Sequence, residues 1–162
     1  MKSLLFAIVF ALLLSSPAFA IDRSLEFDIG YSSPNKGLAG IRFWPEPNWS
    51  FGFIWGSFSF YNDYSDFGIA GSHHFYGYTG PYVFQSHHWL NSKVGNIWEI
   101  STGGGYQQLL GKNFLVYTEL GIPLYIGGGK IWRYYKGGVP RNKDVLFSFR
   151  AGFGVGYMLH LF

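Results

Sequence analysis

The chain has 162 residues, of which 22% are aromatic and only 13% are charged, with 23 glycines, a formal net charge of +3 and no cysteine. A soluble domain of this size needs more surface charge, a disulfide framework is excluded, and so mild a positive charge does not indicate a nucleic-acid partner. An aromatic- and glycine-rich chain with few charges indicates a surface that faces lipid.

The first 20 residues have the pattern of a secretory signal peptide. Lys2 precedes an apolar run from Leu4 to Leu14, and Ala18-Phe19-Ala20 fits the small-x-small cleavage rule. The apolar run is too short to span a bilayer as a helix. We therefore expect an exported protein, with residues 1–20 as the signal peptide and residues 21–162 as one domain.

Segments of alternating apolar and polar residues follow, separated by turn signals. In the first segment, apolar residues from Leu25 to Tyr31 alternate with Glu26, Asp28 and two small residues. No later segment has 18 apolar residues in a row, so a closed barrel is the remaining way to cross a bilayer. The expected strands are 24–32, 38–44, 49–61, the two arms of a hairpin within 67–89, 97–107, 114–126 and 145–162.

The connections between these strands differ in length on the two sides of the barrel. The turns within 45–48, 78–81 and 109–113 are short and share one side with both ends of the chain, whereas the long segment 127–144 lies on the other side. Outer-membrane barrels have short periplasmic turns and longer outer loops. The predicted fold is an all-β, eight-stranded, antiparallel, transmembrane up-and-down β-barrel.

This pattern resembles the small eight-stranded outer-membrane β-barrels of Gram-negative bacteria. The resemblance is carried by the signal peptide, the alternating segments, the stretch FLVYTELGIP after a short turn, and a last strand that ends in Phe162. It implies an outer-membrane location, insertion by the barrel assembly machinery, and a monomer surrounded by lipid and lipopolysaccharide. We expect a structural or surface-interaction role, without a cofactor or enzymatic activity. Phe162 departs from the family pattern, because it is out of phase with the apolar face of its strand.

The polar phase of the strands predicts which charged residues point into the barrel. Arg150 is expected to reach Glu119 on one side and Glu26 or Asp28 on the other, while Arg42 faces the first strand. An eight-stranded barrel is only wide enough for side chains to fill it, and buried charges are normally paired. The sequence therefore predicts a filled lumen with an ion-pair network made by Glu26, Asp28, Arg42, Glu99, Glu119 and Arg150. The alternative is a narrow proton or ion path, with water-filled space beside Gly152, Gly154 and Gly156.

Two Ser-His-His triplets, at 72–74 and 86–88, hold four of the five histidines. A two-residue turn at Thr79-Gly80 would set His74 opposite His87 and His73 opposite His88. Adjacent strand residues point to opposite faces, so one histidine pair faces the lumen and the other faces lipid. Polarity favours the first pair as the inward one, together with Ser72, Tyr76 and Gln85.

Three interpretations of this hairpin compete. His74 and His87 could bind Zn²⁺ or Cu²⁺, with Glu99 as a third ligand. Barrel enzymes that deacylate lipid A instead carry His-x-Ser with an acid on the lipid-facing surface; here the order is reversed, as Ser72-x-His74 and Ser86-x-His88, and no acid is expected in the hairpin. The interpretation that we favour is that these residues are hydrogen-bonded fillers without catalytic or metal-binding function.

The long segment 127–144 is basic and aromatic. Clustered Lys and Arg beside Trp and Tyr at a membrane interface favour contact with anionic lipid phosphates, so we expect this segment to bind lipopolysaccharide. Its GGGK stretch lacks the spacing of a phosphate-binding P-loop. The expected contact residues are Lys130, Arg133, Lys136, Arg141 and Lys143.

Overall fold

The computed structural model describes residues 23–32, 36–56, 64–92, 95–127 and 145–161, and the statements below concern these residues. Within them, no helix is long and apolar enough to cross a membrane. The strands are β1 (Ser24–Ser32), β2 (Lys36–Glu46), β3 (Trp49–Trp55), β4 (Tyr64–His74), β5 (Gly80–Ser92), β6 (Gly95–Leu110), β7 (Phe114–Gly127), β8 (Val145–Phe147) and β9 (Arg150–His160).

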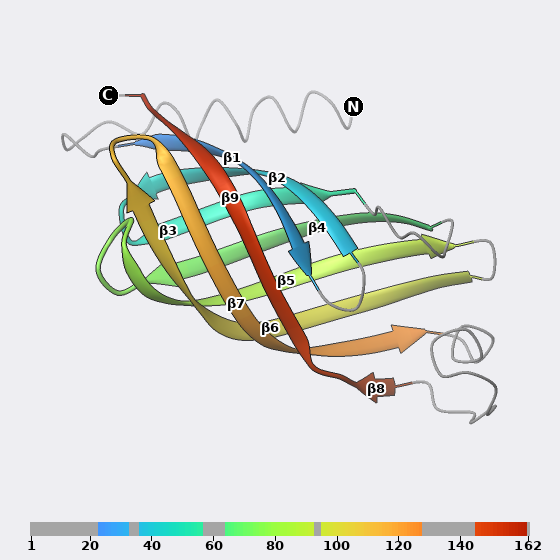
Figure 1. The fold of residues 1–162 in the computed structure, drawn as a ribbon. Coiled ribbons are helices and arrows are strands. Elements are labelled where there is room, and N and C mark those ends of the chain that lie inside the picture. The colour runs from blue at the N-terminus through green and yellow to red at the C-terminus, as the bar shows by residue number, and fades with distance from the viewer. Residues whose placement is uncertain (1–22, 33–35, 57–63, 93–94, 128–144, 162) are drawn as a thin grey trace.

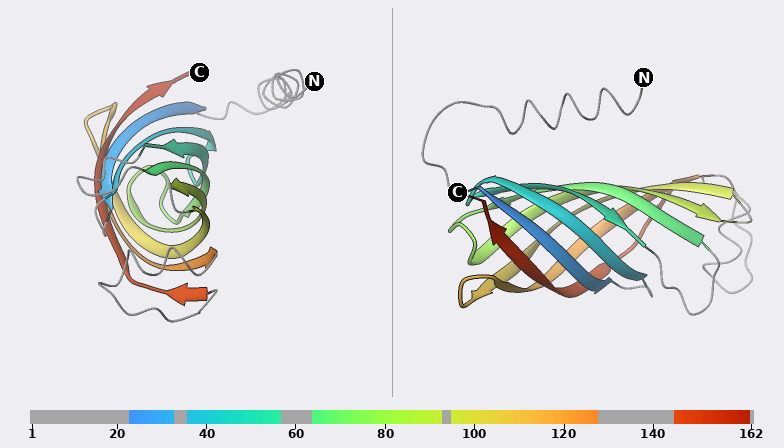
Figure 2. Two further views of the ribbon diagram at one scale, coloured as in Figure 1. Left: turned by 90° about the vertical axis from the view of Figure 1, so that its right-hand side faces the viewer. Right: turned by 90° about the horizontal axis from the view of Figure 1, so that it is seen from above.

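The strands close into a single barrel. Each of β1 to β6 pairs antiparallel with the strand that follows it, and β1 also pairs with β9. Because β8 and β9 pair with β7 in one continuous register, they are two parts of the eighth strand. The sheet curls round on itself when viewed along its length (Figure 2). The predicted closed, eight-stranded antiparallel barrel is confirmed.

The break in the eighth strand lies opposite Pro123 of β7. The backbone N–H of Ser148 donates to the carbonyl of Pro123 at 3.1 Å, but proline has no N–H to donate in return. The ladder between β7 and the eighth strand therefore lacks one hydrogen bond at this point. The neighbouring side chain, Phe149, points outward and is 71% exposed.

The alternation along the strands separates a mostly apolar outer face from an inner face that holds the buried charged residues. Ile29 and Phe153 are 64% and 61% exposed, whereas Glu26 and Arg150 are buried. A soluble barrel has the opposite arrangement, so this distribution fits a barrel whose outer face meets lipid.

The described turns lie at one end of the barrel, together with the start of β1 and the end of β9 (Figure 1). They are Pro47–Asn48, a turn of residues 75–79, and a turn of residues 111–113 in which Gly111 has a φ of 69°. The expected signal peptide, the lipopolysaccharide-binding residues and Phe162 lie outside the described residues.

The His-rich hairpin differs from the sequence prediction. Its turn spans residues 75–79 rather than two residues, and His74 pairs with Tyr82 while Ile69 pairs with His87. Relative to the predicted register, β5 is shifted by an odd number of residues, which moves every β5 side chain to the other face. The predicted facing of His87 and His88 was therefore wrong: His88 is buried in the lumen, and His87 lies on the outer face together with Gln85.

The boundary of β4 also differs. The strand begins at Tyr64, inside a segment that the sequence predicted to be a loop, and this brings Asp66 into the sheet. Asp66 is 3% exposed, and its side chain faces the lumen. The prediction missed this residue because a polar segment next to a strand end reads as a loop, although a polar lumen favours polar residues in the inward phase.

Candidate functional site

A first charged cluster fills the lumen near the turn end of the barrel. Arg42 Nε lies 3.1 Å from Asp28 Oδ2, and the guanidinium of Arg42 lies over the ring of Tyr117, 5.1 Å from its centroid. Glu26 accepts a hydrogen bond of 2.8 Å from the indole N–H of Trp44. The first and second strands thus provide both the charges and the groups that compensate them, which a buried charge requires.

A second charged cluster is built around Arg150. Its Nη1 lies 3.5 Å from Glu99 Oε1 and its Nη2 lies 3.8 Å from Glu119 Oε1, so one guanidinium bridges acids on β6 and β7. The face of the Phe84 ring lies 5.8 Å from the same guanidinium carbon. These side chains are largely shielded from solvent, with side-chain exposures of 4%, 1% and 11% for Arg150, Glu99 and Glu119.

The expected contact of Arg150 with Glu26 or Asp28 does not form. Across the β1–β9 pair, Glu26 lies opposite Met158 and Asp28 lies opposite Gly156, six or more residues along the strand from Arg150. At about 3.3 Å per residue this separation is roughly 20 Å. The alternation in the sequence identified the inward face correctly but not the height of each charge along the barrel.

The glycines of β9 do not leave open space inside the barrel. A Cβ atom on Gly154 would collide with the Tyr117 side chain, and one on Gly156 would lie 2.8 Å from Glu26 Oε1. The large side chains of the opposing strands therefore occupy the volume beside these glycines. A cavity of about 20 Å³ remains between Arg42, Tyr82 and Glu119, which is room for about one water molecule.

The turn end of the lumen is closed by apolar packing. Trp44, Leu115 and Met158 form a fully buried cluster, and Tyr78 and Leu109 pack against it. Tyr78 belongs to the turn of residues 75–79, and its hydroxyl lies 3.1 Å from Ser24 Oγ, while Gln107 Nε2 donates to the Tyr78 carbonyl at 3.1 Å. The sequence missed this closure because the turn was predicted to be tight. An aromatic residue inside the turn was the signal that could have indicated it.

The first Ser-x-His pair is hydrogen-bonded but has no acid. Ser72 Oγ lies 2.7 Å from His74 Nε2 and 2.6 Å from Ser50 Oγ. The imidazole packs between Trp44 and Tyr82, at centroid distances of 4.4 and 4.7 Å. His74 Nδ1 is buried and makes no hydrogen bond within the described residues, so nothing there orients the ring as a catalytic acid would.

The second Ser-x-His pair has an acid but lacks the serine contact. His88 Nδ1 lies 3.0 Å from Asp66 Oδ1, and both side chains are fully buried. The expectation that no acid accompanies the hairpin was therefore wrong. Ser86 Oγ and His88 Nε2 are buried and make no hydrogen bond within the described part of the chain. Neither pair assembles the nucleophile–base–acid contacts of a triad, and both face the lumen rather than lipid.

The proposed pairing of His74 with His87 at a metal is excluded by the register. His74 faces the lumen and His87 faces outward, so the two imidazoles lie on opposite sides of the sheet. Over the described ranges, no group of three or more His, Asp or Glu side chains is placed to hold a metal ion.

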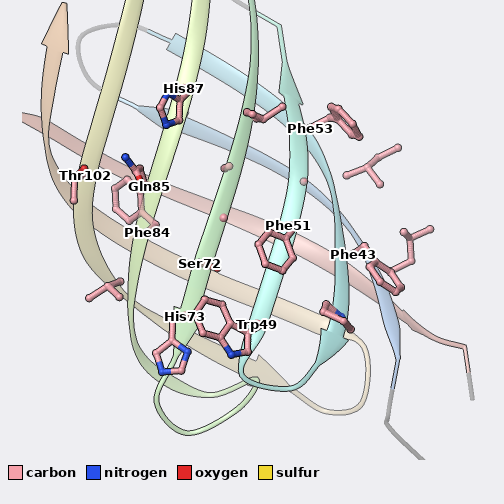
Figure 3. Close-up of a pocket in the computed structure, with 18 residues that line it drawn as sticks. Phe43, Trp49, Phe51, Phe53, Ser72, His73, Phe84, Gln85, His87 and Thr102 are labelled. Atoms are coloured by element: carbon pink, nitrogen blue, oxygen red, sulfur yellow. The ribbon is translucent and has the colours of Figure 1, made fainter. Parts of the chain in front are cut away.

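The outer face of the barrel carries a groove of about 780 Å³ (Figure 3). Trp49, Phe51 and Phe53 of β3 line one side of it, and Gln85 and His87 of β5 line the other. Glycines and an alanine of β3 and β4 lie between these walls, and His73 packs on Trp49 at a centroid distance of 4.4 Å. The groove is largely apolar, and its polar groups come from β4, β5 and β6.

Comparison with known proteins supports the fold. No protein-family model and no curated protein matches the sequence. The chain is similar to the crystal structure of the N-terminal β-barrel domain of Pseudomonas aeruginosa OprF, with a TM-score of 0.57 and 17% identity over 84% of this chain and 97% of that chain. A de novo designed transmembrane β-barrel aligns with a TM-score of 0.49 and 12% identity over 89% of this chain and all of that chain. The likeness to OprF is one of fold: an outer-membrane-type eight-stranded β-barrel.

Proposed function

We propose that this protein is an integral barrel of the Gram-negative outer membrane, with a filled lumen and a structural role in the envelope. The observation that carries the proposal is the distribution of side chains on the two faces. Hydrocarbon and aromatic side chains cover most of the outside of the strands, while the acids and arginines are buried inside. Only a hydrocarbon surrounding makes both faces favourable at once.

The packing inside the barrel supports a structural role. Arg42 and Arg150 each bind carboxylates, and an apolar cluster with Tyr78 above it occupies the turn end. A cavity of about 20 Å³ in the middle is too small for a hydrated ion. A barrel filled in this way contributes mass and rigidity to the membrane rather than a path through it.

The proposed contact with lipopolysaccharide rests on the sequence of the basic segment. Replacing its five basic residues by glutamine removes roughly 1 kcal/mol of attraction per residue close to an anionic surface. We expect binding of the refolded protein to lipopolysaccharide-containing vesicles to weaken and to lose its dependence on salt. Unchanged binding and unchanged salt dependence would exclude this role for Lys130, Arg133, Lys136, Arg141 and Lys143.

The test of the main proposal is fractionation combined with gel migration. We expect the protein to be recovered with the outer membrane of a Gram-negative host. Its unboiled form should migrate differently from its boiled form, because a closed barrel resists detergent denaturation until it is heated. Recovery as a soluble periplasmic protein with a single migration would contradict the proposal.

A narrow channel is the second candidate, and one observation favours it. Several lumenal polar atoms, among them Tyr82 Oη, Ser86 Oγ and Ser101 Oγ, are buried without a hydrogen bond from the described residues. Water could satisfy such groups, and a continuous file of water would conduct protons or ions. Conductance measurements separate this candidate from the filled lumen.

A further inference from the structure

The polar residues of the lipid-facing surface gather on one side of the barrel. In the described ranges, the outward residues of β1, β2, β3 and β9 are hydrocarbon, aromatic, proline or glycine residues, apart from the exposed Glu46 and His160 at the last positions of β2 and β9. On β4, β5 and β6, in contrast, His73, Gln85, His87 and Thr102 point outward. Gly71, Gln85 and Thr102 are direct neighbours across three strands. We call these three residues the polar patch.

Gln85 lies in the interior of β5, between two aromatic levels on the outer face. The strand runs from Gly80 to Ser92. Trp49 and His73 are in contact near its turn end, and Trp89 and Trp98 stack near its other end with centroids 6.3 Å apart. Tryptophan is enriched where a barrel meets the membrane–water interfaces. The amide lies between these aromatic levels, two residues along β5 from the partner of His73 and four from Trp89, and thus on the hydrocarbon side of each.

An amide in this position requires a partner outside its own chain. Gln85 is exposed on the outer face, and its side chain makes no hydrogen bond within the described residues. Lipid tails offer neither donors nor acceptors, and an unsatisfied amide in hydrocarbon costs several kcal/mol. An outward polar group at this depth is therefore a contact point for a partner of matching chemistry.

We infer that the polar patch is the centre of a symmetric dimer of this barrel. Two copies that insert in the same direction are related by a two-fold axis along the membrane normal, and rotation about that axis preserves depth. Gln85 therefore meets Gln85 of the second copy at the same level. An amide is both donor and acceptor, so it can pair with its own copy.

The neighbours of Gln85 fit this arrangement. Gly71 and Thr102, on either side of it, are small, and small residues allow backbones to approach closely inside a membrane. The groove of about 780 Å³, which all three residues of the polar patch help to line, can receive the larger side chains of the second copy. This inference replaces the expected monomer, and it depends on the membrane location proposed above.

Energy transfer between labelled copies in lipid vesicles tests the dimer. The chain has no cysteine, so Ile29→Cys on β1, across the barrel from β5, gives a single labelling site in an otherwise unchanged barrel. We compare this labelled protein with versions that carry Gln85→Leu or Thr118→Val. Thr118 provides the matched control, because it is an outward polar residue on β7, outside the polar patch.

We expect transfer above the level of random proximity for the protein with Gln85 intact and for Thr118→Val. In Gln85→Leu the dissociation constant should rise about eightfold, equivalent to two hydrogen bonds of roughly 0.6 kcal/mol each. Transfer at the random level with Gln85 intact, or equal association with and without Gln85→Leu, would overturn the dimer. Unboiled gel migration of the same samples reports barrel insertion separately. A failure there would contradict the membrane location and the dimer with it.

Discussion

The two lumenal arginines, Arg42 and Arg150, differ in the number of buried carboxylates with which they pair. Arg42 pairs with Asp28, and the neighbouring acid, Glu26, has its own donor in Trp44. Arg150 is the charge partner of both Glu99 and Glu119. Removing one partner of a buried pair is costly because the other charge stays buried. The loss in free energy of unfolding should therefore increase with the number of buried carboxylates that lose their arginine partner.

Arg150→Met should destabilise the barrel more than Glu119→Gln. The first change leaves two buried carboxylates without their arginine and should cost roughly 3–5 kcal/mol. The second leaves Arg150 paired with Glu99 and should cost about 1–2 kcal/mol. Urea unfolding of the barrel in vesicles, extrapolated to water, measures both. Equal losses for the two variants would show that Arg150 does not bridge the two acids.

Replacement of His88, which faces the lumen, should lower the free energy of unfolding, whereas replacement of His73, which faces outward, should not. His88→Phe removes the contact between the imidazole and the buried Asp66 and should cost about 1.5–3 kcal/mol, the range for the loss of a hydrogen bond to a charged group. His73→Phe on the outer face keeps the stacking on Trp49 and should stay within about 0.5 kcal/mol. The unfolding midpoints of the two variants and the wild type decide this. A larger loss for His73→Phe would contradict the observed facing of the hairpin.

The same histidines test the hydrolase hypothesis. Because neither Ser-x-His pair completes a triad, lipid A from cells that express wild type, His74→Gln or His88→Gln should be identical by mass spectrometry. Loss of an acyl chain that occurs only with the wild type would instead show a lipid A hydrolase.

At the scale of strands and turns, the sequence correctly predicted the features that follow from the alternation of apolar and polar residues. The bounds of β1 and the beginnings of β3 and β7 agree with the pattern, and the six charged residues expected inside are inside. The alternation did not predict the register of β5, because this register depends on how the turn of residues 75–79 packs over the lumen. Tyr78 contacts residues more than 25 positions away in the chain, and no local pattern encodes such a contact.

Tyr78→Ala should weaken the closure of the turn end. The change removes a partly buried ring from the cluster of Trp44, Leu115 and Met158, and it should cost roughly 2–3 kcal/mol, less than a fully buried aromatic residue. Tyr76, in the same turn, is 77% exposed, so Tyr76→Ala is the matched control. Urea unfolding of both variants provides the measurement. A loss as large for Tyr76→Ala would mean that membrane anchoring, and not closure of the lumen, stabilises this turn.

At the scale of the whole molecule, buried charged clusters inside the barrel are combined with an outer surface that is mostly hydrocarbon and aromatic in the described ranges. In the described ranges, each strand from β1 to β7 is paired on both sides along part of its length, and the chain has no cysteine, so no disulfide contributes to its stability. The two charged clusters lie at different heights and use different strands. The two clusters therefore occupy different levels of the lumen, and a cavity of about 20 Å³ lies between them.

The filled lumen that we propose predicts that the protein does not conduct. In planar bilayers we expect no large steady current from the wild type, because a cavity of about 20 Å³ does not pass a hydrated ion. Unboiled gel migration of the same preparation shows that folded barrels are present. A reproducible steady conductance would favour the channel over the structural role.

The missing hydrogen bond at Pro123 makes one seam of the barrel mechanically weaker than its neighbours. Beyond Pro123, β8 is held to β7 by three residue pairs, whereas β9 is held on both sides, by β7 and by β1. Regions with few backbone bonds open first. Under force or heat, the eighth strand should therefore unzip from β7 at the end remote from the turns, while β9 still holds the ring closed. We therefore expect the unfolding of this barrel to begin at the seam beside Pro123.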